Sequence, residues 1–143
     1  MKTQEQLKEV FCDNFIAYFR SHVAHVNVVG RNFHGDHALL GGIYEDLQEQ
    51  IDVIAELLRT IDEQMPNDLT DVLMTSSVST DMIAGSADDL LATVLGDLDQ
   101  LKICYLELME VASEEEHEDI ENYAQERVLA IGKFIWKLRS TLD

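Results

Sequence analysis

Two histidines and two acidic residues stand at spacings that could hold a metal ion. His25 and His37 are twelve residues apart, on either side of the turn-forming sequence Gly30-Arg31-Asn32. Asp52 and Glu56 are four residues apart, so on a helix their carboxylates would stack on one side and could bind one cation together. Imidazole nitrogen combined with carboxylate oxygen suits ferrous iron, and open coordination positions would admit an oxidant.

Each of these features also has a purely structural explanation. A histidine on the apolar face of a helix is more often a hydrogen-bonded core residue than a metal ligand. Asp52 and Glu56 fall about 100° or more from the centre of the apolar stripe on their predicted helix, so they could belong to an ordinary solvated flank. The spacing by itself leaves a metal site and a structural role as alternatives.

The elements that must position these residues are long helices. Apolar residues repeat at steps of three and four along most of the chain, which is the spacing of one helical face. We expect helices over residues 3–29, 33–61, 86–113 and 123–142. The stripe of the first helix comprises Leu7, Phe11, Phe15, Tyr18, His22, His25 and Val29. Ser86, followed by Asp88 and Asp89, has the pattern of an N-terminal helix cap.

The connection between the second and third helices is unusually long. Pro66 and Asn67 mark a loop, and the sequence DLTDVLMTSS, residues 68–77, predicts a short extra helix within the connection. Four long helices with one extended connection describe an all-α four-helix bundle of ferritin-like topology, in which the long link crosses the bundle. A chain of 143 residues fits a single domain, residues 1–143.

The charge of the chain limits its partners. It carries 28 acidic residues against 10 lysines plus arginines, for a formal net charge of -18. This balance predicts repulsion from DNA and from anionic membranes. A surface adapted to high salt or an interior that collects cations would both produce it. With no apolar signal sequence and no 18-residue apolar run, we expect a soluble, cytoplasmic protein. Cys12 and Cys104 lack zinc or redox spacing and are expected to be buried.

The candidate ligands cannot all meet within one subunit. His25 and His37 lie near the predicted turn between the first two helices, whereas Asp52 and Glu56 lie about four turns further along the second helix. A symmetric partner running antiparallel could supply the missing half, since a two-fold interface places each surface patch against its own copy. The sequence therefore indicates a metal site shared between subunits.

The segments AHVNVVGRNFHGDHALL and YEDLQEQIDVIAELLRT resemble the Dps family, the small ferritin-like proteins named for protecting DNA during starvation. The family pattern is a histidine before an asparagine and a Gly-x-x-Phe turn, a second histidine twelve residues on, and Asp-x-x-x-Glu closing the same helix. The matching residues here are His25, Asn27, Gly30, Phe33, His37, Asp52 and Glu56. The similarity is strongest over residues 15–60 and returns weakly in DLDQL and GKFIWKLRS.

The resemblance implies a homododecameric shell in which His25 and His37 of one subunit face Asp52 and Glu56 of its two-fold mate. Members of the family oxidise ferrous iron at this site, typically with hydrogen peroxide and more slowly with oxygen. They store the ferric product inside the shell. The chain is therefore expected to be a ferroxidase and iron-storage protein that handles Fe2+ and Fe3+ and protects against oxidative damage.

Two positions depart from the family pattern within this site. Gly41 stands where the family usually has an aspartate four residues after the second histidine. The second iron position is therefore expected to be weak, completed by water, or served by another group such as Asp36 or Glu45, with one tight iron per site. Val26 replaces the family's tryptophan after the first histidine, which puts in doubt any role for an aromatic there in accepting radical electrons.

Two further regions bear on partners and iron entry. DNA-binding relatives often use Lys- and Arg-rich terminal extensions, and only Lys2 and Lys8 stand near the start here. Twelve subunits of -18 each would carry about -216, so we expect no DNA binding under ordinary salt. Residues 114–122, EEEHEDIEN, are by default a solvated turn. In the family this region borders a three-fold pore, so Glu118 and Glu121 are candidates for drawing cations inward.

Two other functions fit the same residues. The first is a cage that sequesters iron or zinc with little turnover, because Gly41 disables the second metal position. The second is an architectural helical oligomer with a vestigial site, for which His25→Ala and Asp52→Ala would change nothing except stability.

Overall fold

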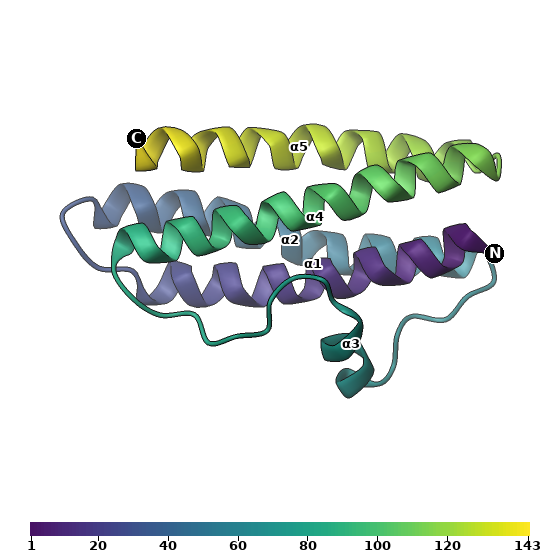
Figure 1. Ribbon diagram of the computed structural model, residues 1–143, viewed down its shortest axis with the longest axis horizontal. Helices are drawn as coiled ribbons and strands as arrows, with labels where there is room; N and C mark the ends of the chain where they lie inside the picture. Colours follow the sequence, from purple (N-terminus) through teal and green to yellow (C-terminus); the bar gives the residue numbers. More distant parts are fainter.

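The computed structural model describes all 143 residues and contains helices but no strands. The helices are α1 (Lys2–Asn27), α2 (Phe33–Thr60), α3 (Leu69–Thr75), α4 (Ala87–Glu114) and α5 (Glu118–Leu142). Successive long helices α1 and α2 run antiparallel, as do α4 and α5, whereas α2 and α4 point the same way (Figure 1). The all-α four-helix bundle with a short extra helix in the long connection is confirmed.

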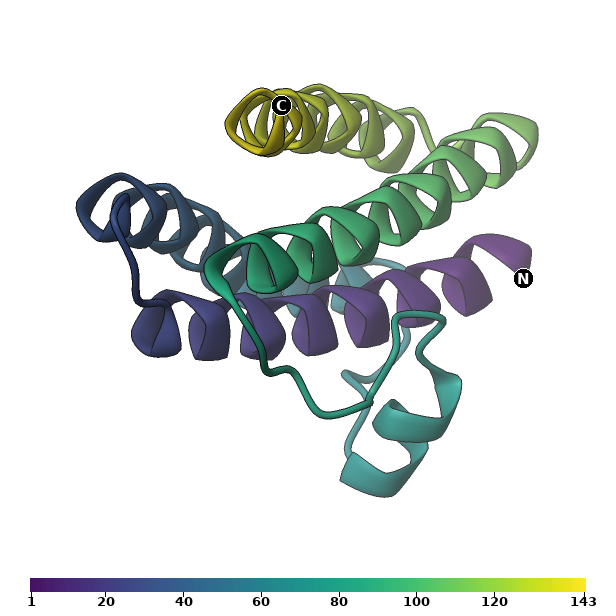
Figure 2. The same ribbon diagram turned by 60° about the vertical axis from the view of Figure 1, so that its left-hand side comes forward.

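The long connection from α2 to α4 passes along the outside of α1 and carries α3 away from the bundle (Figure 2). It is anchored by two buried charged residues of α1. Asp13 is fully buried and accepts hydrogen bonds from the Ser76 hydroxyl at 3.0 Å and from the Ser77 backbone N–H at 2.7 Å. Arg20 forms a buried ion pair with Asp97 of α4, at 2.7 Å from Nε to Oδ2, and donates a hydrogen bond from Nη1 to the Asp81 carbonyl oxygen in the connection. These contacts, together with the buried side chains of Val72 and Val78, hold the connection in a defined path.

The end of α1 differs from the sequence-based expectation. The helix ends at Asn27 because Val28 adopts an extended conformation, with φ -63° and ψ 139°. Gly30 then has φ +129°, a backbone conformation that residues other than glycine rarely adopt, and this completes the turn into α2. Val29 is consequently 72% exposed, so its assignment to the core stripe was wrong.

The start of α5 also differs from expectation. The helix begins at Glu118, five residues before the predicted start, and the turn between α4 and α5 covers only residues 115–117. Ile120 is fully buried and faces the core, although it is surrounded in sequence by acidic residues. Glu118 and Glu121 thus belong to the first turn of a helix and not to a solvated loop.

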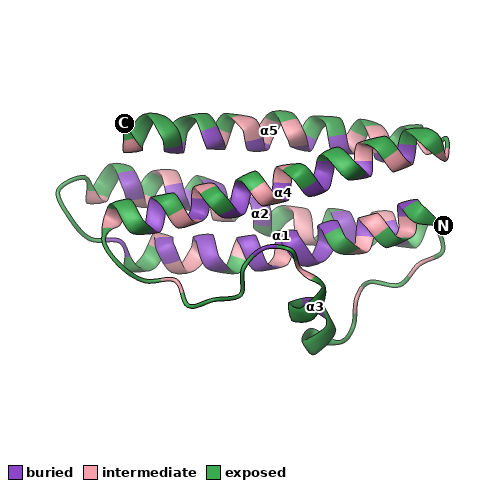
Figure 3. Cartoon of the chain, in the orientation of Figure 1, coloured by how far each residue is buried: buried purple, intermediate pink, exposed green.

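The core lies between the four long helices, whose inward faces are buried along their length (Figure 3). Each long helix contributes fully buried aliphatic side chains, for example Leu7, Leu47, Leu101 and Ile131. Each such side chain stabilises the fold by about 1.5–3 kcal/mol through burial. Both cysteines are buried and unpaired, as expected. Trp136 is 59% exposed and so is not a core residue of the subunit. No helix is both long enough and apolar enough to span a membrane.

Candidate metal centre

His25, in the last turn of α1, and His37, in the first turns of α2, face each other across the turn that Gly30 makes possible. Their rings stack with centroids 3.8 Å apart and planes inclined by 15°. The Nδ1 atom of His25 lies 2.7 Å from the backbone carbonyl oxygen of His37, and the Nδ1 atom of His37 lies 2.7 Å from the carbonyl oxygen of His25. The two histidines therefore lock the ends of α1 and α2 together through a reciprocal pair of hydrogen bonds.

These hydrogen bonds determine which ring nitrogen carries the proton. A carbonyl oxygen only accepts, so each Nδ1 must donate an N–H. In the neutral ring the Nε2 atom is then unprotonated and has a free lone pair. A histidine that binds a metal through one ring nitrogen usually donates the N–H of its other ring nitrogen to a carbonyl oxygen or a carboxylate, which orients the ring. The pair consequently offers two oriented Nε2 lone pairs that could bind a metal ion.

The stacking also determines how many ions the pair can bind. A histidine binds a metal in its ring plane at about 2.0–2.1 Å from the nitrogen. Two nearly parallel rings with centroids 3.8 Å apart do not point their in-plane lone pairs at a common atom. In this arrangement a single ion cannot be bound in the ring planes of both histidines.

Gly41 provides the space in which the His25 ring lies. A Cβ atom built on Gly41 would stand 2.9 Å from Cε1 of His25, closer than real Cβ contacts, and 3.1 Å from Nδ1, which is tighter than most. The adjacent Gly42 has no heavy atom within 4 Å of its equivalent Cβ position. The His25 ring and a side chain at position 41 thus exclude each other. No carboxylate can occupy position 41 unless His25 moves.

Asp36 and Glu45 could each replace the carboxylate that is missing at position 41, but only one of them has a carboxylate free to bind a metal. Asp36 is 4% exposed and accepts a hydrogen bond from Asn32 Nδ2 at 2.9 Å, so its carboxylate is already engaged at the turn. Glu45 is exposed on α2 and remains available to a neighbouring subunit.

Asp52 and Glu56 lie exposed on α2. A different side of the helix is held to α5, because Asp46 pairs with Arg127 at 2.5 Å and Gln50 accepts a hydrogen bond from the Tyr123 hydroxyl at 2.6 Å. Neither Asp52 nor Glu56 forms an ion pair within the subunit. This rotation of α2 presents the two carboxylates to the outside of the subunit.

The structure brings the two histidines together but not the two carboxylates to them. Fifteen residues of continuous helix separate His37 from Asp52, which corresponds to about 22 Å. No group of three or more histidine, cysteine, aspartate or glutamate side chains within one subunit is arranged to hold a metal ion. A complete set of ligands drawn from these four residues therefore requires a second subunit.

A cluster of aromatic rings beside His25 was missed from the sequence. Tyr44 stacks on His22 with ring centroids 4.0 Å apart and planes inclined by 3°, and its centroid is 4.9 Å from that of His25. The Tyr18 hydroxyl lies 3.2 Å from Nδ1 of His22. The spacing of four residues from Tyr18 to His22 is the only signal in the sequence that could have revealed this contact.

Glu118 and Glu121 lie far along the chain from the histidines, in the first turn of α5. Glu118 is exposed and Glu121 is half-buried. A role for them at a pore stays a prediction.

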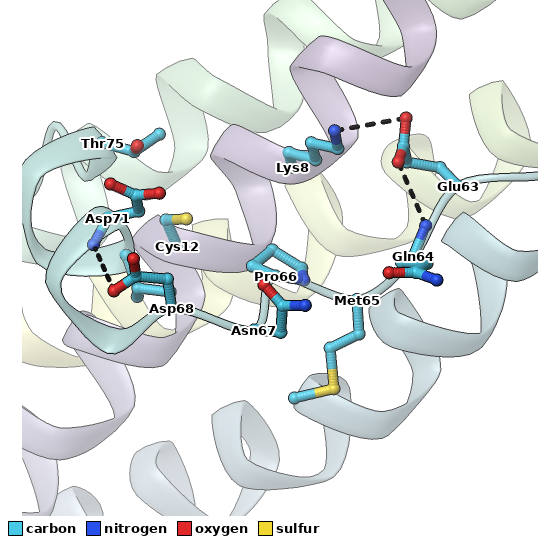
Figure 4. A pocket seen from close by; sticks show the side chains of 11 residues that line it. Lys8, Cys12, Glu63, Gln64, Met65, Pro66, Asn67, Asp68, Asp71 and Thr75 are labelled. Atoms are coloured by element: carbon cyan, nitrogen blue, oxygen red, sulfur yellow. Dashed lines mark hydrogen bonds and ion pairs between the residues drawn. The ribbon is translucent and has the colours of Figure 1, made fainter.

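A separate pocket of about 310 Å³ lies between α1, the loop after α2, and α3 (Figure 4). Lys8 and Glu63 form an ion pair of 3.2 Å at its edge, and Asp68 caps α3 with its side chain. Burial raises the pKa of the Cys12 thiol to about 11, and the nearby Asp13 adds to this effect. The thiol is thus protonated at neutral pH, and Cys12 does not give this pocket a nucleophilic or metal-binding thiolate.

Comparison with known proteins places the fold and these residues in context. The family model described as a ferritin-like domain matches residues 4–143. The chain belongs to the ferritin-like family. Within it, the chain is similar to Dps proteins, as the motif around the two histidines indicated. It is 26% identical over 143 residues to a DNA protection during starvation protein of Helicobacter pylori, covering 99% of both chains.

Solved structures agree with this assignment. The ferritin-like chain superimposes on the structure of Helicobacter cinaedi CAIP with a TM-score of 0.90 and 27% identity, covering 99% of each chain. It superimposes on Dps from Vibrio cholerae O1 with a TM-score of 0.93 and 20% identity, covering 99% of this chain and 89% of the other. The second likeness shows the shared fold alone.

Proposed function

We propose that this ferritin-like chain is a ferroxidase and iron-storage protein that forms a homododecameric cage and takes cytoplasmic iron as its cargo. The observation that carries the proposal is the interlocked pair His25 and His37, whose free Nε2 atoms are oriented as metal ligands. The similarity to Dps proteins supports it, since the Helicobacter pylori relative, 26% identical over 143 residues, is named a DNA protection during starvation protein.

In this proposal each site is completed across a two-fold interface. Nε2 of His25 binds one Fe2+ together with Asp52 and Glu56 of the partner subunit. Nε2 of His37 faces a neighbouring position that has no carboxylate from residue 41, because the His25 ring fills that space. One iron per site is consequently bound tightly, and a second is bound weakly.

The reaction oxidises iron and reduces peroxide. Two Fe2+ ions give one electron each to hydrogen peroxide, which takes up two protons and forms two molecules of water, and the Fe3+ produced is stored as mineral. Oxygen serves as a slower oxidant. Consuming peroxide and Fe2+ together suppresses hydroxyl-radical formation. The formal charge of -18 per subunit draws cations to the cage and argues against direct DNA binding.

The test measures Fe2+ oxidised per subunit when peroxide is added anaerobically, followed as ferric absorbance. Asp52→Ala should reduce the initial rate to that of buffer, because it removes an iron ligand. Asp99→Ala removes an exposed carboxylate from α4 and should leave the rate unchanged. Equal rates in Asp52→Ala and the native protein would reject the shared site.

One observation favours a second function. The contact between Gly41 and His25 leaves the second metal position without a carboxylate, so the cage could sequester iron or zinc with little turnover. Metal titration by calorimetry would then show binding that depends on Asp52, while peroxide produces no ferric absorbance above that of buffer.

A further inference from the structure

Two polar contacts join α5 to α2 just before the part of α2 that carries the proposed carboxylate ligands. Arg127 binds Asp46 through two hydrogen bonds, of 3.2 Å from Nη1 to Oδ1 and 2.5 Å from Nη2 to Oδ2. The Tyr123 hydroxyl donates to Oε1 of Gln50 at 2.6 Å. Asp46 and Gln50 are four residues apart, so they lie one turn from each other on the same side of α2. No other hydrogen bond or ion pair links the two helices.

Arg127 and Tyr123 are themselves held in place within the bundle. The side chain of Arg127 is 7% exposed, and its guanidinium carbon lies 6.0 Å from the ring centroid of Tyr105 in α4. The rings of Tyr105 and Tyr123 meet edge to face with centroids 6.0 Å apart, and their hydroxyl oxygens are 3.4 Å apart. Burial raises the pKa of Tyr123, so its hydroxyl stays a hydrogen-bond donor at neutral pH. Helices α4 and α5 thus present two fixed groups to α2.

Asp52 and Glu56 have no ion pair within the subunit that fixes them. They follow Gln50 by two and six residues in one unbroken helix, which corresponds to about 3 Å and about 9 Å along its axis. The direction in which they point is therefore set by the rotation of α2. A carboxylate about 5–6 Å from the helix axis moves by about 1 Å when the helix rotates by about 10°. A metal site needs its ligands within about 0.5 Å of the productive geometry, so even this rotation would displace them.

The polar contacts with α5 fix this rotation more closely than the apolar contacts of α2 do. Helix α2 packs mainly against α1 and touches α5 at few other places. Leu47 and Leu58 are fully buried, but hydrophobic burial is non-directional, whereas a bidentate arginine–carboxylate pair has a fixed geometry. The hydrogen bonds of His37 anchor the start of α2, but about 22 Å before Asp52. Gln50 is the residue nearest to Asp52 whose side chain is hydrogen-bonded to another helix.

We propose that Arg127 and Tyr123 are positioning residues for the shared metal site. By fixing the rotation of α2 they aim Asp52 and Glu56 at the metal ion across the two-fold interface, and neither of them touches the ion. The inference rests on the proposed function, because it assigns a role toward the site that the proposed function describes.

The experiment titrates the assembled protein with Co2+ alone, followed by calorimetry and by visible absorption. Co2+ binds the same nitrogen and oxygen ligands as Fe2+, and its visible absorption reports the coordination geometry. Arg127→Lys keeps the charge but loses the two-pronged contact, and Tyr123→Phe loses one hydrogen bond. Each should raise the Kd of the Co2+ site that depends on Asp52 about tenfold, as loss of a group that orients a metal ligand typically does. Each should also change the visible spectrum of the bound ion.

Arg20→Lys is the matched control. Arg20 also forms a buried ion pair with an aspartate, but this pair joins α1 to α4 and does not involve α2. Arg20→Lys should lower the stability in urea unfolding, as Arg127→Lys does, and leave both the Kd and the spectrum of bound Co2+ unchanged. Equal weakening of Co2+ binding in Arg20→Lys would reject the positioning role, because the loss would then follow from stability alone.

The remaining outcomes separate the positioning role from the proposed function. If Arg127→Lys and Tyr123→Phe bind Co2+ as the native protein does while Asp52→Ala does not, the positioning role is rejected and the shared site stands. If Asp52→Ala binds Co2+ as the native protein does, the shared site is rejected and the positioning role with it. If the native protein binds Co2+ through Asp52 but oxidises no Fe2+ above the buffer rate, the ferroxidase proposal is rejected and the positioning role stands.

Discussion

The adjacent glycines Gly41 and Gly42 of α2 permit a direct test of how the His25 ring is packed. Both lie within the helix, so replacing either one with alanine gives the same gain in helix propensity, about 0.8–1.0 kcal/mol. Their surroundings differ. The new Cβ atom at position 42 meets nothing within 4 Å, whereas at position 41 it would stand 2.9 Å from Cε1 of His25.

The expected free energies of unfolding follow from this difference. Gly42→Ala should stabilise the subunit by about 0.5–1 kcal/mol. In Gly41→Ala the His25 ring must shift away from its hydrogen bond to the His37 carbonyl and from its stack, and such overpacking costs about 1–3 kcal/mol. The propensity gain is common to both variants and cancels, so the gap between them should be about 1–3 kcal/mol.

Urea unfolding followed by far-UV circular dichroism measures this gap, with both variants at one protein concentration because assembly makes stability concentration-dependent. In thermal unfolding the gap corresponds to about 2–4 °C per kcal/mol. Gly41→Ala should also weaken iron binding, since Nε2 of His25 moves with its ring. If the two alanine variants are equally stable, the His25 ring does not lie against Gly41 and the explanation for the absent carboxylate is wrong.

Glu115 accepts hydrogen bonds from the Thr3 side chain and backbone N–H and from the Lys2 N–H, which lower its pKa below the ordinary 4.5. A lowered carboxyl pKa gives stability that is complete above pH 4.5 and lost as the pH falls through the folded-state value. Glu115→Gln should thus lower the melting temperature at neutral pH and have a smaller effect in acid. An equal effect at both pH values would contradict this. Burial raises the pKa of Cys12 to about 11 and that of Cys104 well above its ordinary value. Both thiols should react with Ellman's reagent only after unfolding, and rapid reaction of the folded protein would refute their burial. Asp13→Ala removes the hydrogen bonds to Ser76 and Ser77 and should cost about 2–4 kcal/mol in urea unfolding. It should also speed proteolysis between residues 61 and 86, and unchanged cleavage would show that other contacts hold the connection.

Most of the fold could be predicted from the sequence because its helices are long and strongly periodic. Side chains such as Leu47 and Leu101 recur at helical spacing, and Ser86 with Asp89 forms the capping box that the sequence suggested. The two boundary errors have physical causes. Val29 fits the apolar rhythm but follows an extended residue, and Ile120 is a single apolar residue within an acidic run. A periodicity argument cannot detect either.

The candidate site could be predicted only in part. The sequence placed His25 and His37 near one turn between two helices, and the structure brings their rings together there. The reciprocal hydrogen bonds depend on the backbone direction set by Gly30, and the contact with Gly41 depends on how closely α1 approaches α2. The cluster of aromatic rings around Tyr44 arises from packing between these helices. Such features come from tertiary geometry and have no pattern in one sequence. The completion of the site by a second subunit stays a prediction.

The reciprocal hydrogen bonds between His25 and His37 mean that evolution constrains the two histidines differently from the other two proposed ligands. The histidines join two helices, so a lineage that lost its need for iron would still be selected to keep them for folding. Asp52 and Glu56 have no comparable partner within the subunit and would drift freely in such a lineage. Among descendants of this protein, conservation of Asp52 and Glu56 would therefore indicate that the site still binds iron. Conservation of the two histidines would indicate only that the fold persists.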